Sequence, residues 1–339
     1  EEIEIGFDAA ILDQRLNLEV TQYWKTTEDA IVDQRLAPSL GFPGTQSLNV
    51  GQVSNWGTEI GAGLQVLREG PVQWDIGAAF ATMNNRVDEL GGTVERIPIG
   101  EDQVGLYHVE GYPLASFFHK KVVSADFVSG NRGAVTNVLC DAGTDVNESG
   151  TLAGGFGGAA VPCAQAPQIF WGRAGQPTWS LNLNSGLTLF NNWRLSATAD
   201  GVGGHYQVDQ EIAARHTTYG TTEAFQRKDN PIIMAYTAQQ DGVSRNPLAI
   251  YGGGFMRLRE VSLLYTLPEA LAGRFGANNA ALKLAGRNLG WLWKEQPTTD
   301  LGGVNVTDPE RRLPGSFAGH VHKNIPTFST ATFEIRVGF

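Results

Sequence analysis

Apolar and polar residues alternate along many short segments of the chain, a pattern typical of β-strands with one apolar and one polar face. In the first segment, Ile3, Ile5 and Phe7 alternate with Glu4 and Gly6. The same period recurs in segments at residues 3–11, 16–24, 58–66, 74–80, 179–189, 193–199, 261–267, 282–284 and 331–339. The sequence therefore predicts about nine strands. Lengths of about 9–11 residues would suit a tilted crossing of a lipid bilayer.

The connections between these strands fall into two length classes that alternate along the chain. Tight turns are expected at residues 13–14, 68–72, 191–192 and 268–279, and long connections at roughly 28–54, 87–177, 206–254 and 290–327. In an up-and-down barrel this order puts all short turns at one end and all long loops at the other, as in outer-membrane barrels. A soluble sandwich with Greek-key connections gives no reason for such sorting. We therefore expect an all-β fold, an antiparallel up-and-down transmembrane β-barrel with long external loops.

The composition of the two faces supports this interpretation. The polar rows hold Asp, Glu, Arg, Asn, Lys and Thr, which would be costly to bury in a dry core but are suited to a wet lumen. Five tryptophans lie near predicted strand ends, where an aromatic girdle would meet the membrane boundary: Trp24, Trp56, Trp74, Trp179 and Trp193. Any one of them, taken alone, could equally pack in an ordinary core.

The overall composition agrees with a barrel and argues against other classes. The 339 residues include 42 Gly and 18% charged residues, and the mean hydropathy of -0.18 is what two averaged faces would give. No stretch approaches the roughly 18 apolar residues of a membrane-spanning helix. A net charge of -10 argues against nucleic-acid binding. The length alone would also suit about two soluble domains.

The strand count indicates an incomplete barrel. Bacterial antiparallel barrels have an even number of strands, and about nine are found here. Residues 1–339 are therefore expected to form the C-terminal part of a larger barrel, a partial barrel of about nine to ten strands, unless a strand is missed within residues 87–177. The segment 117–127 is the candidate for such a strand.

Several segments, in this order, resemble the SusC/RagA group of TonB-dependent receptors. Residues 49–60 are similar to the group's N-x-G-x-x-x-N-x-G-x-E strand entry, and residues 110–118 to its G-x-P-x-x-S-F segment. The most specific match is residues 258–268, Leu-Arg-Glu-Val-Ser-Leu-Leu-Tyr-Thr-Leu-Pro, followed by Gly-Arg-Asn-Leu at 286–289. The terminal Phe339 fits the aromatic last residue that serves as a barrel-assembly signal. The resemblance covers nearly the whole chain.

This resemblance implies a barrel of about 22 strands with an internal plug, energised through TonB, that imports glycans or oligopeptides. It implies a SusD-like surface lipoprotein as a partner, contact with outer-membrane lipid, and location in the cell outer membrane. No plug domain is recognisable in this chain, so TonB would act through a plug outside it. Two alternatives remain open: a passive porin or small autonomous barrel, and a secreted all-β carbohydrate-binding or adhesin domain.

Two cysteines, Cys140 and Cys163, lie in the longest predicted loop. On the oxidising external side they are expected to form a disulfide, which would contribute roughly 3 kcal/mol by closing its loop. The glycine-rich stretch 154–158 between them lacks the strand-to-helix context and the Lys of a phosphate loop, so a flexible external loop is expected.

No metal, cofactor or catalytic site is predicted. His320 and His322 could bind a metal, but no further ligand has suitable spacing. Asp300, Asp308 and Glu310 lack the spacing of a calcium loop, so we expect them in an exposed acidic loop. No Ser-His-Asp or paired-carboxylate arrangement points to an enzyme.

Cargo contacts in an importer of this kind should come from aromatic and amide side chains on external loops and the upper lumen. The candidates for substrate binding are residues at the long-loop ends of the predicted strands: Trp171, Arg173, His205, Tyr206 and Trp293. Each could instead hold loops or the girdle together.

Overall fold

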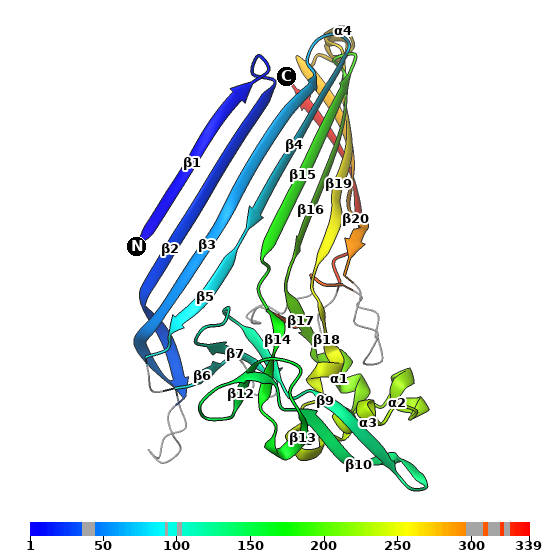
Figure 1. Cartoon of the computed structure of the whole chain (residues 1–339). Helices are drawn as coiled ribbons and strands as arrows, with labels where there is room; N and C mark the ends of the chain where they lie inside the picture. The colour runs from blue at the N-terminus through cyan, green and yellow to red at the C-terminus, as the bar shows by residue number, and fades with distance from the viewer. Residues whose placement is uncertain (36–44, 92–93, 100–103, 296–307, 311–318, 322–325) are drawn as a thin grey trace.

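The computed structural model describes residues 1–339 except 36–44, 92–93, 100–103, 296–307, 311–318 and 322–325. Its main feature is one long, curved antiparallel sheet (Figure 1). Nine strands pair in the order β1 (Glu2–Ile11), β2 (Leu16–Arg35), β3 (Thr45–Leu67), β4 (Val72–Thr82), β15 (Trp179–Leu189), β16 (Trp193–Gly203), β19 (Phe255–Thr266), β20 (Asn279–Lys294) and β22 (Thr330–Gly338). A tenth strand, β5 (Asn84–Glu89), pairs with β3. The predicted partial barrel of about nine to ten strands is confirmed.

All the short turns lie at one end of this sheet, as predicted (Figure 1). The β1–β2 turn is tight because Leu12, Asp13 and Gln14 adopt left-handed backbone angles, with φ of 55°, 55° and 65°. The β19–β20 turn contains a short helix, α4 (Glu269–Ala272), followed by the 3₁₀ turn η6 (Gly273–Phe275). The long connections leave from the opposite end, which we call the long-loop end.

The pair β2 and β3 extends well beyond its predicted length. A long connection was expected over residues 28–54, but the two strands stay paired to Arg35 and from Thr45. The register shifts twice near Ala30, so the alternation of side chains is lost while backbone hydrogen bonding continues. Backbone pairing that continues after the alternation is lost cannot be recognised from a period of two in the sequence.

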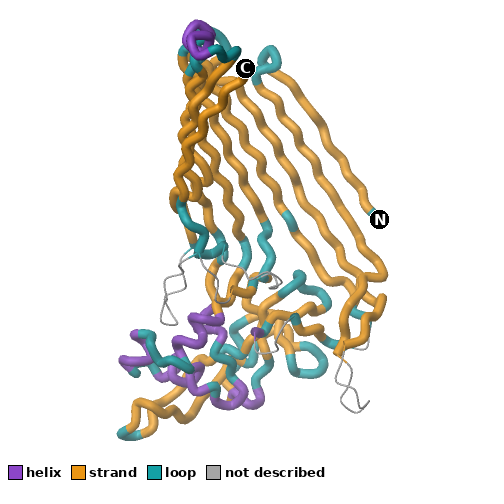
Figure 2. Tube along the Cα trace, turned by 180° about the vertical axis from the view of Figure 1, so that it is seen from behind, coloured by secondary structure: helices purple, strands orange, loops and turns teal. Residues whose placement is uncertain are grey.

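The long connections fold into smaller sheets and helices at the long-loop end (Figure 2). One sheet has the order β11 (Thr144–Val146), β12 (Leu152–Gly155), β14 (Gln168–Ala174), β8 (Ser116–His119), β7 (Leu106–Val109) and β6 (Arg96–Pro98). A second contains β13 (Ala160–Pro162), β10 (Asn131–Asp141) and β9 (Val122–Val128), and a third β18 (Ile250–Gly252), β17 (Tyr206–Asp209) and β21 (His320–Val321). Residues 117–127 therefore contribute to β8 and β9, which are not strands of the barrel sheet.

Three helices start at side chains that accept backbone N–H groups. Asp209 caps α1 (Gln210–His216), Thr222 caps α2 (Glu223–Arg227) and Asn230 caps α3 (Pro231–Ala238). No helix in the described ranges has the length and apolar composition needed to cross a membrane.

Among the described residues, most buried apolar side chains lie in this long-loop region, and few lie in the barrel sheet. Met234 and Tyr236 of α3 pack against Val122 and Val135 of β9 and β10. The barrel sheet instead exposes large apolar side chains along whole strands, including Ile3, Ile5, Phe7, Leu284, Phe333, Ile335 and Val337. Such an extended apolar face needs an apolar surrounding, which a lipid bilayer provides.

Candidate binding site at the mouth of the barrel

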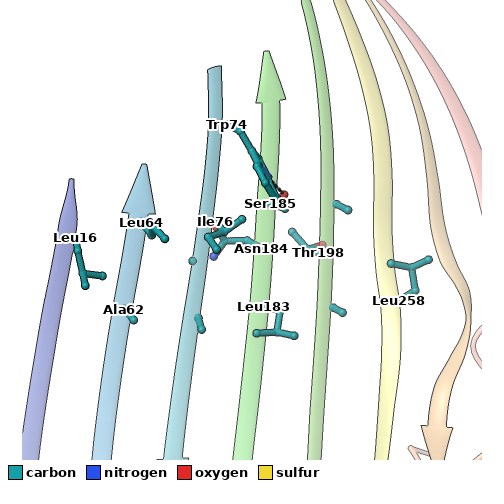
Figure 3. Close-up of a pocket in the computed structure, with 14 residues that line it drawn as sticks. Leu16, Ala62, Leu64, Trp74, Ile76, Leu183, Asn184, Ser185, Thr198 and Leu258 are labelled. Atoms are coloured by element: carbon teal, nitrogen blue, oxygen red, sulfur yellow. Dashed lines mark hydrogen bonds between the residues drawn. The ribbon is translucent and has the colours of Figure 1, made fainter. Parts of the chain in front are cut away.

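The apolar face of the sheet carries residues from neighbouring strands in matching register. A shallow trough of about 540 Å³ lies across this face. Figure 3 shows the side chains of Leu16, Leu64, Ile76 and Leu183 around it. Trp74 Nε1 donates to the Ser185 hydroxyl at 3.0 Å, so the polar atoms of both side chains are paired with each other. Because its lining is mostly apolar, this surface suits lipid chains and not a polar cargo.

Tryptophans border this apolar face at two levels. Trp193, beside a short turn, stacks on Tyr265 with ring centroids 4.2 Å apart. Toward the long-loop end, Trp24 and Trp56 are direct cross-strand partners, and Trp179 stacks on Trp293 with centroids 6.3 Å apart. This arrangement fits the two aromatic belts of a membrane barrel.

The opposite face is polar and carries ion pairs between adjacent strands and also across an intervening strand. Arg194 pairs with Asp75 at 3.0 Å. Glu260 on β19 pairs with two cations of β20, Lys283 at 3.0 Å and Arg287 at 2.8 Å. We assign this face to the barrel interior, because the apolar face must meet lipid.

A β-bulge on β19 increases the charge at one level of this interior face. Thr198 of β16 lies opposite Glu260 and Ala199 lies opposite Leu258, so Arg259 is an extra residue without a partner in register. The side chains of the consecutive residues Arg259 and Glu260 both bind groups on the polar face. The bulge thus lets two neighbouring charged residues reach the barrel interior.

Above the bulge, toward the long-loop end, charged side chains from three parts of the chain meet. Glu310 Oε2 accepts hydrogen bonds from Arg257 Nη1 at 2.6 Å and from Arg259 Nη1 at 2.9 Å. Arg259 Nη2 also donates to Asp200 Oδ2 at 2.9 Å, and Asp308 lies 3.8 Å from Arg257 Nη1. We call Asp200, Arg257, Arg259, Asp308 and Glu310 the mouth cluster.

The mouth cluster is shielded from solvent to different degrees. The side chains of Arg257 and Asp308 are each 4% exposed, and that of Glu310 is 20% exposed. The Arg257 guanidinium lies over the Trp291 ring, 4.5 Å from its centroid. Burial alone would raise the pKa of Glu310, but hydrogen bonds and charge from Arg259 and Arg257 outweigh it and hold the pKa below its usual value. Glu310 is therefore a carboxylate at neutral pH.

The exposed acidic loop predicted for Asp308 and Glu310 is therefore wrong. Their partners lie on β19, about fifty positions earlier in the chain, and a local acidic pattern does not reveal such a distant pairing. Asp300 and His322 lie outside the described residues, and His320 belongs to β21, paired with Val208. In the described part of the chain, no cluster of three His, Cys, Asp or Glu residues could hold a metal ion.

Two of the five predicted substrate contacts meet close to the start of β19. Arg173 Nη1 pairs with Glu295 Oε1 at 2.7 Å, and its guanidinium lies 5.0 Å from the centroid of the Tyr206 ring. Glu295 Oε2 also accepts from the Gly254 amide at 3.2 Å, at the start of β19. The structure thus places a cation and an aromatic ring together where β19 and β20 end.

The side chains of the other three predicted contacts are engaged in other interactions. Trp171 packs against a buried cluster and donates from Nε1 to the His119 carbonyl at 3.2 Å. His205 is fully buried, 3.3 Å from the Gln207 amide nitrogen. Trp293 is stacked on Trp179 at the apolar face.

Sequence reasoning missed the mouth cluster. The one available signal was Leu258-Arg259-Glu260, where two consecutive charges break the alternation of β19.

The two cysteines form a disulfide within the long-loop region. The Sγ atoms of Cys140 and Cys163 lie 2.00 Å apart, and both residues are fully buried. The adjacent Asp141 accepts three backbone N–H groups, from Gly143, Gly157 and Gly158. Burial acts to raise the pKa of Asp141, but these three amides lower it overall. The glycine-rich stretch 154–158 therefore binds a carboxylate of its own chain.

Comparison with known proteins gives the family. Residues 1–280 match the family described as TonB dependent receptor-like, beta-barrel. The chain belongs to this family. The family and the fold agree with the SusC/RagA resemblance of the sequence and identify an outer-membrane β-barrel.

Two relatives from Formosa agariphila match along the whole chain. TonB-dependent receptor P26 is 23% identical over 358 residues, covering 99% of this chain and 34% of the relative. TonB-dependent receptor P3 is 22% identical, covering 100% of this chain and 34% of the relative. The chain thus spans about a third of the length of the relatives it matches.

Solved structures show the same fold. The RagAB peptide importer in its 'closed-closed' state has a TM-score of 0.74 and 19% identity, covering 100% of this chain and 35% of that chain. The 'open-open' state has a TM-score of 0.71 and 17% identity, with 34% of that chain covered. At these identities the likeness establishes the fold alone. Family membership favours a receptor barrel over a porin and over a secreted adhesin.

Proposed function

We propose that residues 1–339 form the C-terminal part of the barrel of a TonB-dependent outer-membrane importer of oligopeptides or glycans. TonB would act through a plug outside this chain, and a SusD-like lipoprotein would cover the long-loop end from the cell surface. The chain would serve as wall and mouth of the passage, without catalysis.

The observation that carries this proposal is the separation of the two faces. The apolar face offers lipid an almost unbroken surface, whereas the polar face leads to the mouth cluster at the long-loop end. A groove of about 520 Å³ runs along the polar face between Glu19, Glu59, Asn182 and Asp200. Polar side chains along such a wall can exchange hydrogen bonds with a hydrated cargo, as transport through a barrel interior requires.

The test is uptake by the full-length receptor in cells with and without TonB. We expect fluorescent oligopeptides or oligosaccharides to enter only when the receptor, TonB and the SusD-like partner are all present. Uptake that continues without TonB would point to a passive porin. Absence of uptake in every strain, despite a correctly assembled barrel, would refute the proposed import.

The orientation of the loops has its own test. Glu148 lies in the long-loop region and Glu69 in a short turn, and both are exposed. Cysteine introduced at Glu148 should react with a membrane-impermeant maleimide on intact cells, whereas cysteine at Glu69 should react only after lysis. The reverse labelling pattern would overturn the external assignment of the long loops.

A further inference from the structure

One carboxylate in the mouth cluster is clamped by two arginines of the wall. Glu310 Oε2 accepts from Arg257 at 2.6 Å and from Arg259 at 2.9 Å, and Glu310 Oε1 pairs with Arg259 as well. Two guanidinium groups on one carboxylate form a charge-assisted site with strong preference for that group.

The carboxylate is supplied by a loop, whereas the arginines belong to the wall. Glu310 lies in the connection between β20 and β22, and Arg257 and Arg259 lie on β19. Within the cluster, the wall contributes two cations and one anion, Asp200, which gives a net charge of +1 (2 − 1) without the loop residues. Without Asp308 and Glu310, the wall residues of the cluster therefore carry a net positive charge that favours binding of an anion.

Arg257 retains capacity for a further acceptor. Its Nη1 donates to Glu310 and its Nη2 to the Thr327 carbonyl at 3.1 Å. Its buried Nε has no hydrogen-bond partner among the described residues. A buried guanidinium without its carboxylate is strongly destabilised, so if Glu310 left, Arg257 would favour another anion in its place.

We propose that Arg257 and Arg259 form a binding site for a carboxylate of the cargo, and that Glu310 occupies this site until cargo displaces it. The inference rests on the proposed import function and adds that the cargo is anionic. A peptide and a uronic-acid glycan both offer the required carboxylate. Each would form the same two-arginine contact that Glu310 now makes.

The experiment measures binding to the purified full-length receptor by isothermal titration calorimetry. The probes are hexaalanine against its C-terminal amide, and trigalacturonate against its methyl ester. The variants are Glu310→Gln, which removes the charge that competes with cargo for the two arginines, and Arg259→Gln, which removes one of the two arginines of the binding site. Glu334→Gln is the matched control, since Glu334 forms an exposed ion pair with Arg336 on β22.

We expect at least one acidic probe to bind more tightly than its neutral counterpart, and the pair that discriminates identifies the source of the carboxylate. If Glu310 leaves the site free about a tenth of the time, Glu310→Gln should tighten binding about tenfold. Arg259→Gln should weaken binding by about tenfold or more, and Glu334→Gln should leave it unchanged. Should Glu310→Gln fail to assemble, judged by heat-modifiable gel mobility, Glu310→Asp tests the same point with a smaller gain.

Equal binding of acidic and neutral probes would overturn the proposal, as would no binding of either acid. Unchanged affinity in the Glu310 variant would also overturn it. Binding to purified receptor needs no TonB, so this result is independent of the uptake test. A receptor that binds carboxylates but fails in uptake would refute the import function and not the site.

Discussion

His119 on β8 should make the long-loop region sensitive to acid. Its side chain lies in the interior, with the residue 2% exposed, beside the ring of Trp171. A Cβ atom on Gly105 would lie 2.2 Å from the imidazole, so the surroundings leave little space. Burial lowers the pKa of His119 from 6.5 to about 4, although a hydrogen bond with the Val104 backbone acts in the opposite direction. His119 is therefore neutral in the folded region at pH 7.

The magnitude follows from proton linkage. As the pH falls below 6.5, the unfolded region binds a proton at His119, but the folded region does not until about pH 4. Because the folded pKa is the lower one, this contribution is fully present above pH 6.5 and is lost as the pH falls toward 4. The gap between 6.5 and about 4, at roughly 1.36 kcal/mol per pH unit, corresponds to about 3 kcal/mol. About 2 kcal/mol of this should be lost by pH 5.

Hydrogen exchange of the β8 amides in the full-length receptor measures this loss. We expect protection, corrected for intrinsic exchange, to fall between about pH 7.5 and about pH 5. In His119→Gln most of this pH dependence should disappear. His108 and His216, whose pKa values burial also lowers, remain as background in both proteins. An equal acid-dependent loss in wild type and His119→Gln would refute the reasoning.

Three further changes test other parts of the structure. Replacing Cys140 and Cys163 by Ser should cost about 3 kcal/mol in the long-loop region, read from protease resistance in urea; a wild type without a reducible cross-link would contradict this. Gly57→Ala should lower the heat-modifiable barrel fraction, at a cost of about 1–3 kcal/mol, because its Cβ would lie 2.0 Å from a backbone oxygen of β4. Gly63→Ala, with nothing within 4 Å, is the control and should assemble normally. Phe339→Ala should reduce the assembled fraction at unchanged synthesis, and equal assembly would remove the residue's role as an assembly signal.

The barrel sheet could be predicted from sequence because its two faces meet different surroundings. Leu183 and Leu187 face the same side as Leu195 in the register of β15 and β16, and Asn182 and Asn184 face the other. Successive side chains face opposite sides of the sheet, so apolar and polar residues alternate with a period of two along each strand. The short turns followed from the same pattern, since it breaks wherever a strand ends.

The mouth could not be predicted in the same way, because its contacts join distant parts of the chain. The Arg257–Glu310 bond spans 53 positions and the Arg173–Glu295 bond spans 122. Arg173 and Tyr206 were found as candidates from their position at strand ends, but their partner Glu295 was not. The helices and small sheets of the long connections were also missed, because their packing onto one another decides their structure more than local period does.

The bulge at Arg259 has a consequence for how β19 tolerates change in length. Between the bulge and the short turn, even-numbered residues such as Glu260 and Ser262 share the charged side, and beyond it odd-numbered Arg257 does. The bulge therefore accommodates the extra residue Arg259, and the strand on each side of it keeps its own alternation of interior and lipid-facing residues. Deleting Arg259 would leave a regular alternation, with Arg257 and Glu260 still facing the interior and Leu258 facing lipid, but would remove the Arg259–Asp200 ion pair. A gain or loss of two residues in either half would preserve both alignments.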